Sequence, residues 1–272
     1  MRAFPTSPQR LSSCDSYVWP VAMEVLDLAV IAAVLSIGAF IKGATGMGLP
    51  LISIPILTST LGLTHAIGVL LLPIIVTNAW QAIRFRKELQ DAKMRFLWPM
   101  VAASVAGMAI GTAGLATLNE RLLVLVLAGV IFLYVGLRLT RPDIVLGQSM
   151  AMKLSLFVGV LAGALQGATG ISSPIAATYV HAMRLSYGAH VFALSVVFLV
   201  ATVAQLPALA VAGILQWRWI GEGVFALLPV VCFLPLGQKL GAYIDQALFD
   251  RVILIFLAII GTTLVFRGLT AA

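Results

Sequence analysis

Long apolar runs separated by short charged segments make up the chain, and none alternates apolar and polar residues as a half-buried strand would. In order, the runs occupy 25–41, 50–61, 66–83, 96–118, 122–137, 154–165, 174–183, 190–215, 223–243 and 252–266. A helix needs about 20 apolar residues to cross a bilayer, and several runs reach that length. Because backbone amides in lipid must be paired within their own segment or in a closed barrel, the pattern predicts an all-α polytopic membrane protein.

Composition supports this class and excludes others. Hydrophobic residues make up 61% of the chain and charged residues 10%, whereas a soluble domain carries about 25% charge. The net charge of +7 does not indicate nucleic-acid binding, since the basic residues lie between the apolar runs, where they orient a membrane protein. Cys14 and Cys232 lie far apart in dissimilar sequence contexts, and neither belongs to a cluster of histidines and carboxylates, so we expect no metal site and no cofactor.

A short segment occurs twice, as KGATGMGLP at 42–50 and as QGATGISSP at 166–174. The shift of 124 residues that superposes the two copies also places Gln81 on Gln205. A shift of 130 residues superposes further pairs, namely Gly107 on Gly237, Gly111 on Gly241, and Glu120-Arg121 on Asp250-Arg251. This ordered series predicts two repeats. We expect them at 24–140 and 154–268, with a disordered extension at 1–23 and a cytoplasmic linker at 141–153.

The basic residues predict how the two repeats are oriented. The loops at 84–95 and 138–153 are rich in arginine and lysine, so both should be cytoplasmic. The helix at 66–83 then runs inward, whereas its counterpart at 190–215 runs outward. We therefore expect inverted-topology repeats, an arrangement common among secondary transporters.

Each half begins with a glycine-rich break. The run Pro50–Leu61 has 12 residues, about 18 Å as a helix, which is too short to cross roughly 30 Å of hydrocarbon. Each repeat should therefore contain a broken or re-entrant Gly-rich hairpin followed by three transmembrane helices. Ten short spans, or eight full spans with two re-entrant loops, both remain open.

The two breaks are where we expect a ligand. A helix N-terminus offers unpaired N–H groups and the positive end of the helix dipole, which favour an anion, and glycine lets backbone approach a ligand closely. Inverted symmetry would bring two such termini together near the midplane. The candidate substrate-binding residues are Lys42, Gly43, Thr45, Gly46, Gly48, Asn78, Gln81, Gln166, Gly167, Thr169, Gly170, Ser172, Ser173 and Gln205.

Several of these residues also have a purely structural interpretation. Lys42 follows an apolar run and should lie within the membrane, where charges are usually functional, although a lysine can also extend its side chain to the interface. Asn78, Gln81 and Gln205 either line a pathway or join helices. For the GxxxG-spaced pair Gly107 and Gly111 we favour close helix packing.

At these motifs the chain resembles the TauE/SafE family of transporters, linked to sulfite and organosulfonate export. The family motif is approximately G-x-x-G-x-G-G-G, followed five residues later by Pro. Its matches in this chain are Gly43, Gly46, Gly48 and Pro55 in the first copy, and Gly167 and Gly170 in the second, where Ser172 and Ser173 replace glycines. The resemblance covers 24–268. It implies a secondary transporter, most simply an exporter, that moves a small, often sulfur-containing anion across the bacterial inner membrane by alternating access.

Other function classes explain less of the sequence. No G-x-x-x-x-G-K-[ST] motif is present, so a gradient rather than bound ATP should drive transport. Catalytic groups are not clustered, so we expect no enzyme. His65 and His190 fit interfacial positions better than proton coupling. An uptake permease for another organic anion, a non-transporting scaffold subunit, a proton or sodium as the coupling ion, and a homo-oligomer remain alternatives.

Overall fold

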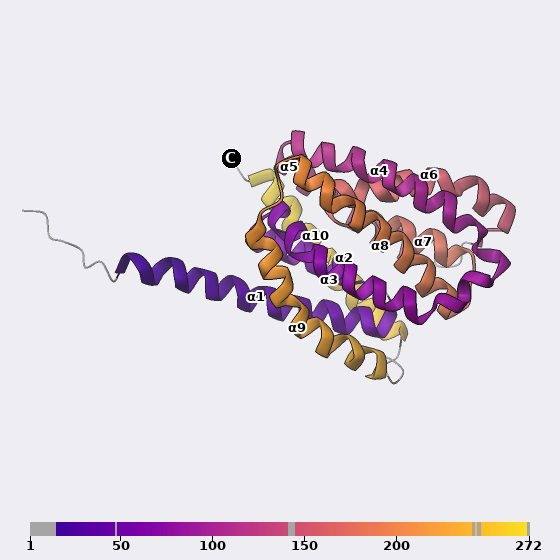
Figure 1. Ribbon diagram of the computed structural model, residues 1–272, viewed down its shortest axis with the longest axis horizontal. Coiled ribbons are helices and arrows are strands. Elements are labelled where there is room, and N and C mark those ends of the chain that lie inside the picture. Colours follow the sequence, from indigo (N-terminus) through magenta and orange to yellow (C-terminus); the bar gives the residue numbers. More distant parts are fainter. Residues whose placement is uncertain (1–14, 47, 141–144, 241–242, 244–245, 271–272) are drawn as a thin grey trace, which may run out of the picture.

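The computed structural model describes residues 15–46, 48–140, 145–240, 243 and 246–270, and the side chains of 15–24 and 246–250 lie outside this description. These residues form a helical bundle without strands (Figure 1). The helices of the first half are α1 (Asp15–Thr45), α2 (Leu49–Leu61), α3 (Leu63–Arg84), the 3₁₀ turns η1 (Arg86–Gln90) and η2 (Ala92–Phe96), α4 (Leu97–Thr117) and α5 (Glu120–Thr140). Those of the second half are α6 (Gln148–Thr169), α7 (Ser173–Ala182), α8 (Tyr187–Val211), α9 (Trp217–Leu240) and α10 (Gln246–Thr270).

Length and composition divide the described helices into two kinds. Eight are long and apolar enough to cross a membrane, namely α1, α3, α4, α5, α6, α8, α9 and α10. The second helix of each half is short, with 13 residues in α2 and 10 in α7. The all-α polytopic prediction is therefore confirmed, and the chain is a multi-pass membrane protein. Of the two arrangements left open, eight long helices with two short ones fit these lengths.

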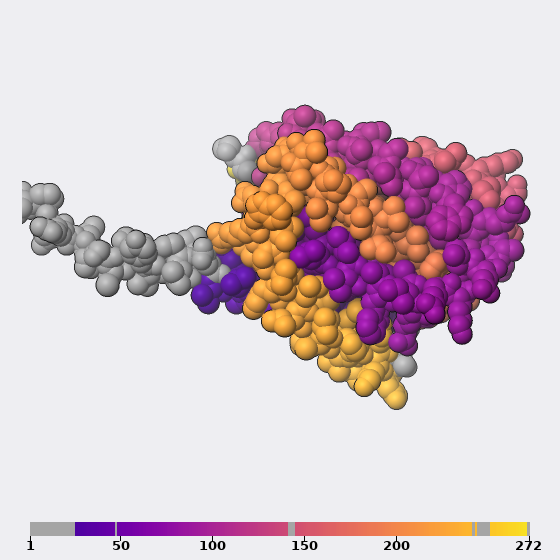
Figure 2. Space-filling model, in the orientation of Figure 1, coloured from indigo at the N-terminus to yellow at the C-terminus, as the bar shows by residue number. Residues whose placement is uncertain are grey.

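The main contacts in the bundle are between helices of different halves. The most extensive packing joins α4 of the first half to α6 of the second, and α9 of the second half to α1 of the first. Further pairs also join the two halves: α3 packs on both α8 and α9, and α8 packs on α4 as well. On the face drawn in Figure 2, the surface of α3 lies between α8 and α9. The first helix of each half therefore packs mainly against a helix of the other half.

Glycines permit this close packing. A Cβ added to Gly107 or Gly111 of α4 would collide with the carbonyl oxygens of Val160 and Ala164 in α6. A Cβ on Gly237 of α9 would likewise collide with a backbone carbonyl of α1. The packing interpretation of the GxxxG spacing is confirmed. Close packing of this kind stabilises helix pairs in lipid, where no hydrophobic driving force brings helices together.

Two boundaries differ from the sequence-based expectation. The first helix begins at Asp15, within the extension that we expected to lack structure, while residues 1–14 lie outside the described part. The helix α6 begins at Gln148, within the expected linker, of which residues 141–144 also lie outside. Both helices also continue as far as the glycine-rich breaks, beyond the apolar runs at 25–41 and 154–165. The residues that extend them there, KGAT at 42–45 and QGAT at 166–169, are polar or small rather than strongly apolar.

Candidate functional site

The first glycine-rich break joins α1 to α2. Gly46 and Gly48 both have positive φ, 81° and 118°, which L side chains rarely adopt, so glycine is required there. The amide of Gly46 donates to the carbonyl of Lys42 at 2.8 Å and ends the helix, and Pro50 stands in the first turn of α2. The chain therefore reverses between Thr45 and Leu49 without crossing to the other end of the bundle.

The second break, between α6 and α7, repeats this geometry. Gly170 has a φ of 74°, and its amide donates to the carbonyl of Gln166 at 2.8 Å. Ser172 is the residue before α7, and Pro174 occupies its first turn. The hydroxyl of Ser173, buried at the start of α7, has no hydrogen-bond partner.

A glutamine from the following long helix supports each break. Gln81 of α3 donates through Nε2 to the carbonyl of Gly46 at 3.3 Å, and Gln205 of α8 donates to the carbonyl of Gln166 at 3.2 Å. Both glutamines are buried. The carbonyl of Gly46 lies past the end of α1 and has no partner within the helix, so Gln81 satisfies a group that would otherwise remain unpaired. The carbonyl of Gln166 already accepts from the amide of Gly170, and Gln205 adds a second hydrogen bond to it. The structural interpretation of the two glutamines thus has a specific basis.

One turn before each break, a side chain reaches the same following helix. The ammonium of Lys42 donates to Oδ1 of Asn78 at 2.6 Å, and Lys42 is only 1% exposed. At the aligned positions, Gln166 donates to the hydroxyl of Thr202 at 2.7 Å. Lys42 is therefore buried against α3 and does not extend to an interface.

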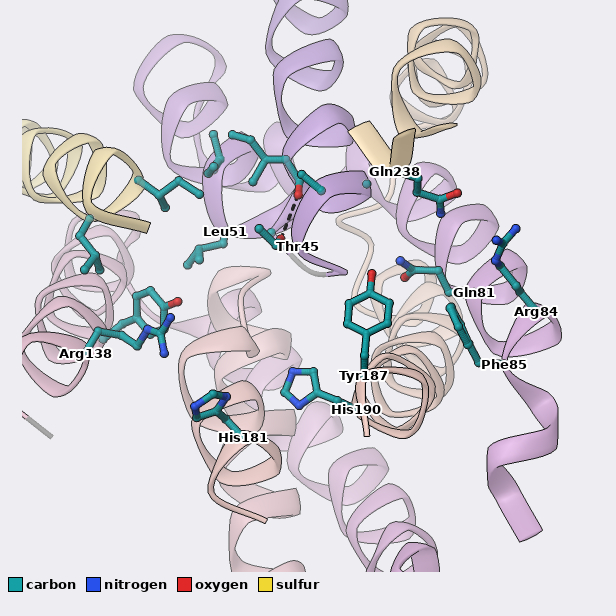
Figure 3. A pocket seen from close by; sticks show the side chains of 18 residues that line it. Thr45, Leu51, Gln81, Arg84, Phe85, Arg138, His181, Tyr187, His190 and Gln238 are labelled. Carbon is teal, nitrogen blue, oxygen red and sulfur yellow. Dashed lines mark hydrogen bonds between the residues drawn. The ribbon is translucent and has the colours of Figure 1, made fainter. Parts of the chain in front are cut away.

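A cavity of about 620 Å³ lies beside the first break (Figure 3). Its wall is formed by residues from α1, α2, α3, α5, α7, α8, α9 and α10: Ile41, Gly43, Ala44, Thr45, Gly48, Leu51, Ile52, Gln81, Arg84, Phe85, Tyr134, Arg138, His181, Tyr187, His190, Gln238, Ile253 and Leu254. Ligand sites in proteins commonly enclose about 300–1,000 Å³, so this space suits a small molecule. Both halves contribute to it.

Basic groups dominate the polar part of this wall. Figure 3 shows His181 and His190 side by side at one edge, with their rings 6.1 Å apart in an edge-to-face arrangement. Arg84 and Arg138 add two guanidinium groups, which stay protonated in proteins. The carboxylates of the described chain are absent from the wall, so its charge favours an anion.

Tyr187 connects this basic region with the break. In Figure 3 its hydroxyl points toward the segment that follows Thr45. That oxygen lies 3.7 Å from the position that a Cβ on Gly46 would occupy. A ligand in the cavity would therefore meet a hydroxyl donor and the glycine-rich backbone together. Among the described residues, no group of three or more His, Cys, Asp or Glu is arranged to hold a metal ion.

The structure distributes the predicted site residues over three environments. Four of them line the cavity: Gly43, Thr45, Gly48 and Gln81. Three are buried just behind that wall: Lys42, Gly46 and Asn78. The remaining seven surround the second break, outside the wall: Gln166, Gly167, Thr169, Gly170, Ser172, Ser173 and Gln205. The two breaks thus do not share one cavity in this conformation.

The lining residues that escaped the sequence-based selection include Arg84, Arg138, His181, Tyr187 and His190. The arginines were used only to orient the helices, and His190 was assigned to an interface. These residues share only their place in the chain: each lies within a few residues of a helix end, on the side of the basic loops. Only the fold reveals that these ends converge on the first break.

No curated protein and no solved structure matches the chain. The sulfite exporter TauE/SafE family model, by contrast, matches residues 30–264, which include both breaks and every residue of the cavity wall. Since this match covers most of the chain, the protein belongs to the TauE/SafE sulfite exporter family.

Proposed function

We propose that this protein is a secondary transporter of a small oxyanion, with sulfite and organosulfonates as the leading substrate class. The observation that carries the proposal is the cavity in which Arg84, Arg138 and two histidines stand beside the first glycine-rich break. Cationic side chains and backbone N–H groups recognise sulfonate and sulfite oxygens by charge-assisted hydrogen bonds. Family membership supports transport rather than catalysis.

The size and lining of the cavity favour an anion with an apolar portion. A volume of about 620 Å³ is far larger than a bare sulfite needs. Another part of the wall is aliphatic, with Leu51, Ile253 and Leu254 among its members. An organosulfonate would place its charged head near the arginines and histidines and its carbon skeleton against the aliphatic side chains.

Asymmetry between the two ends of the bundle supports alternating access. Under the shifts of 124 and 130 residues, the cavity residues His181, Tyr187 and Tyr134 correspond to Leu57, Leu63 and Leu264. Those three leucines are 0% exposed and belong to the apolar core. If the repeats are inverted, a cavity exists at one end while its counterpart is closed by packed side chains, as expected for one state of a two-state carrier.

The open end is the one that carries the basic loops. Arg84 ends α3, and the segment 84–95 that follows contains five basic residues, which predicts a cytoplasmic location. A cavity open to the cytoplasm could load a substrate for export. Export is therefore the direction that we favour, and uptake of another organic anion by the same cavity is the alternative.

A flux assay in proteoliposomes tests the proposal. The purified protein would be reconstituted and offered radiolabelled sulfite, sulfate, alkyl sulfonates and carboxylates, with protein-free liposomes as the control. We expect saturable flux of sulfonates or sulfite and little flux of sulfate. Absence of flux for every anion, from a protein that remains folded, would favour a non-transporting scaffold. Preference for a carboxylate would retain transport but reject the sulfur-containing class.

A further inference from the structure

Lys42 is a buried amine that, within the described residues, is hydrogen-bonded through its side chain to a neutral amide alone. Its ammonium has three donors, of which one reaches Oδ1 of Asn78 at 2.6 Å. The side chain is 1% exposed, and no described side chain accepts from the other two. A buried ammonium without a counter-charge is costly, and lysine in such a setting can lose its proton.

No carboxylate on the neighbouring helices offsets this charge. α2 has no charged residue, and the charged or titratable side chains described on α1, α3 and α9 besides Lys42 are Asp27, His65, Arg84, Arg218, Glu222, Cys232 and Lys239. Asp27 precedes Lys42 by 15 positions along α1, about 22 Å. Glu222 is bonded to His65 and Arg218. Lys42 therefore makes no ion pair within the described side chains.

The aligned side chain in the second half both donates and accepts hydrogen bonds without carrying a charge. Gln166 donates to Thr202 at 2.7 Å and accepts from the hydroxyl of Ser172 at 2.7 Å. In the first half, Gly48 stands where Ser172 does, so the hydroxyl that donates to Gln166 has no counterpart there. A glutamine therefore suffices to hold a break against the following helix, and the structural task alone does not explain the lysine.

The wall of the cavity passes next to Lys42 in the chain, because Gly43 and Ala44 line it. Thr45 of α1 and Gln81 of α3 line the cavity, and they follow Lys42 and Asn78 by three positions each, about one helical turn. An anion at the first break would thus be the closest counter-charge available. In a low-dielectric interior, opposite charges attract strongly over such a distance.

We propose that Lys42 binds the proton that is transported together with the anion. This inference rests on the proposed transport function. With the cavity empty, the side chain is a neutral amine; when an anion enters, the amine takes one proton from water in the cavity and becomes the ammonium that balances the bound charge. When the anion leaves on the other side, the proton returns to water there. One proton then moves with each monovalent anion, in the same direction.

The consequence is electroneutral transport. A lone anion would be driven outward by an inside-negative potential, whereas a proton–anion pair carries no net charge across the membrane. Its direction then follows the gradients of the anion and of protons. The coupling of proton transport to anion transport is therefore assigned to the first half of the chain alone, because the second half has Gln166 at the position of Lys42.

Proteoliposomes with the wild-type protein provide the first test. An alkyl sulfonate is the suitable probe, because it stays ionised at neutral pH and cannot itself carry the proton. We expect each transported anion to bring one proton, recorded by a pH dye in the lumen, and the flux to be insensitive to a potassium-diffusion potential. Flux without a luminal pH change would overturn the inference while leaving the transport function intact, and absence of all flux would reject both.

Two substitutions separate a titrating lysine from a fixed charge. Arginine cannot be deprotonated in proteins, so Lys42→Arg should retain anion–anion exchange but lose at least tenfold in net flux, since the empty carrier cannot return uncharged. Lys42→Gln, which copies the second half, should remove the coupled pH change. Lys153→Gln, at an exposed position of α6, is the matched control. Net flux by Lys42→Arg at the wild-type rate would contradict the proposal.

Discussion

Gln81 of α3 joins three separate segments through one side-chain amide: its Nε2 donates to the carbonyl of Gly46 at 3.3 Å, and its Oε1 accepts from Ser195 of α8 at 3.1 Å. Because Gln81 also lines the cavity, it holds the first break in place at the cavity wall. Gln205 has the same relation to Gln166, but it lies outside the cavity wall. A glutamine–carbonyl hydrogen bond is therefore present both at the break that borders the cavity and at the break that does not.

Replacing Gln81 by leucine should therefore impair both folding and transport. The carbonyl of Gly46 and the hydroxyl of Ser195 would lose a partner, and each unsatisfied buried group costs about 1–3 kcal/mol. We expect a lower melting temperature in detergent and a lower transport rate in proteoliposomes. Gln81→Glu has a similar shape but adds a negative charge, so it should repel the anion and raise KM more than it lowers stability. Equal effects of both substitutions on KM would argue against a place for Gln81 in the cavity wall.

The break itself should not tolerate a side chain at Gly46. Its φ of 81° costs a non-glycine residue about 1–2 kcal/mol, and an added Cβ would lie 2.7 Å from Cγ2 of Val191. Gly46→Val is therefore expected to abolish transport, and Gly46→Ala to reduce it strongly, in flux assays normalised to folded protein. Gly136→Ala is the matched control, because a Cβ there meets nothing within 4 Å and the backbone is helical. Wild-type flux by Gly46→Ala would refute the requirement for glycine.

Most of the fold could be predicted from the sequence, because it follows from local features. Apolar runs predicted the long helices, and the repeated Gly–Ala–Thr–Gly segments predicted both breaks. The helix ends were less certain, since alanine and glycine continue α1 and α6 beyond their strongly apolar residues. The inverted relation of the two halves stays a prediction, although their reciprocal packing supports it.

The cavity could be predicted only in part, because it depends on which helix ends converge. Thr45 and Gly48 were selected for the break that they form, and they do line the cavity. His181 and Arg138 carry no local signal, since a basic residue at a helix end is ordinary in a membrane protein. The expected shared midplane site for both breaks also required a symmetric conformation, whereas the structure has a cavity beside the first break.

A contact at the opposite end of the bundle should control the second state. His65 of α3 is hydrogen-bonded to Glu222 of α9, which also accepts from Arg218 at 2.9 Å, and Trp219 stacks on the imidazole with 5.2 Å between ring centroids. The two helices belong to different halves, so this cluster joins them where the counterpart cavity is closed. We expect Glu222→Ala to favour opening at this end.

Cysteine labelling measures that opening. Ala66, which is 0% exposed and adjacent to His65, would be replaced by cysteine in a background without Cys14 and Cys232. Labelling by a membrane-impermeant maleimide from outside should rise several-fold when Glu222→Ala is added. Glu88→Ala, which removes a carboxylate at the cavity end, should leave it unchanged. If Glu222→Ala has no effect, the cluster does not contribute to closure.

The arginines of the cavity should contribute most of the attraction for the anion. Arg84 and Arg138 both line the wall, and a charge-assisted hydrogen bond contributes about 1.5–3 kcal/mol. Arg138→Gln is therefore expected to raise KM by roughly tenfold or more, because 1.4 kcal/mol corresponds to a factor of ten in affinity, while the number of protons moved per anion stays the same. Lys87→Gln, an exposed position in η1 just beyond α3, removes the same charge outside the cavity and should change KM little. If both variants raise KM equally and high salt abolishes the difference from wild type, the arginine acts only through the general surface potential rather than by contact with the anion.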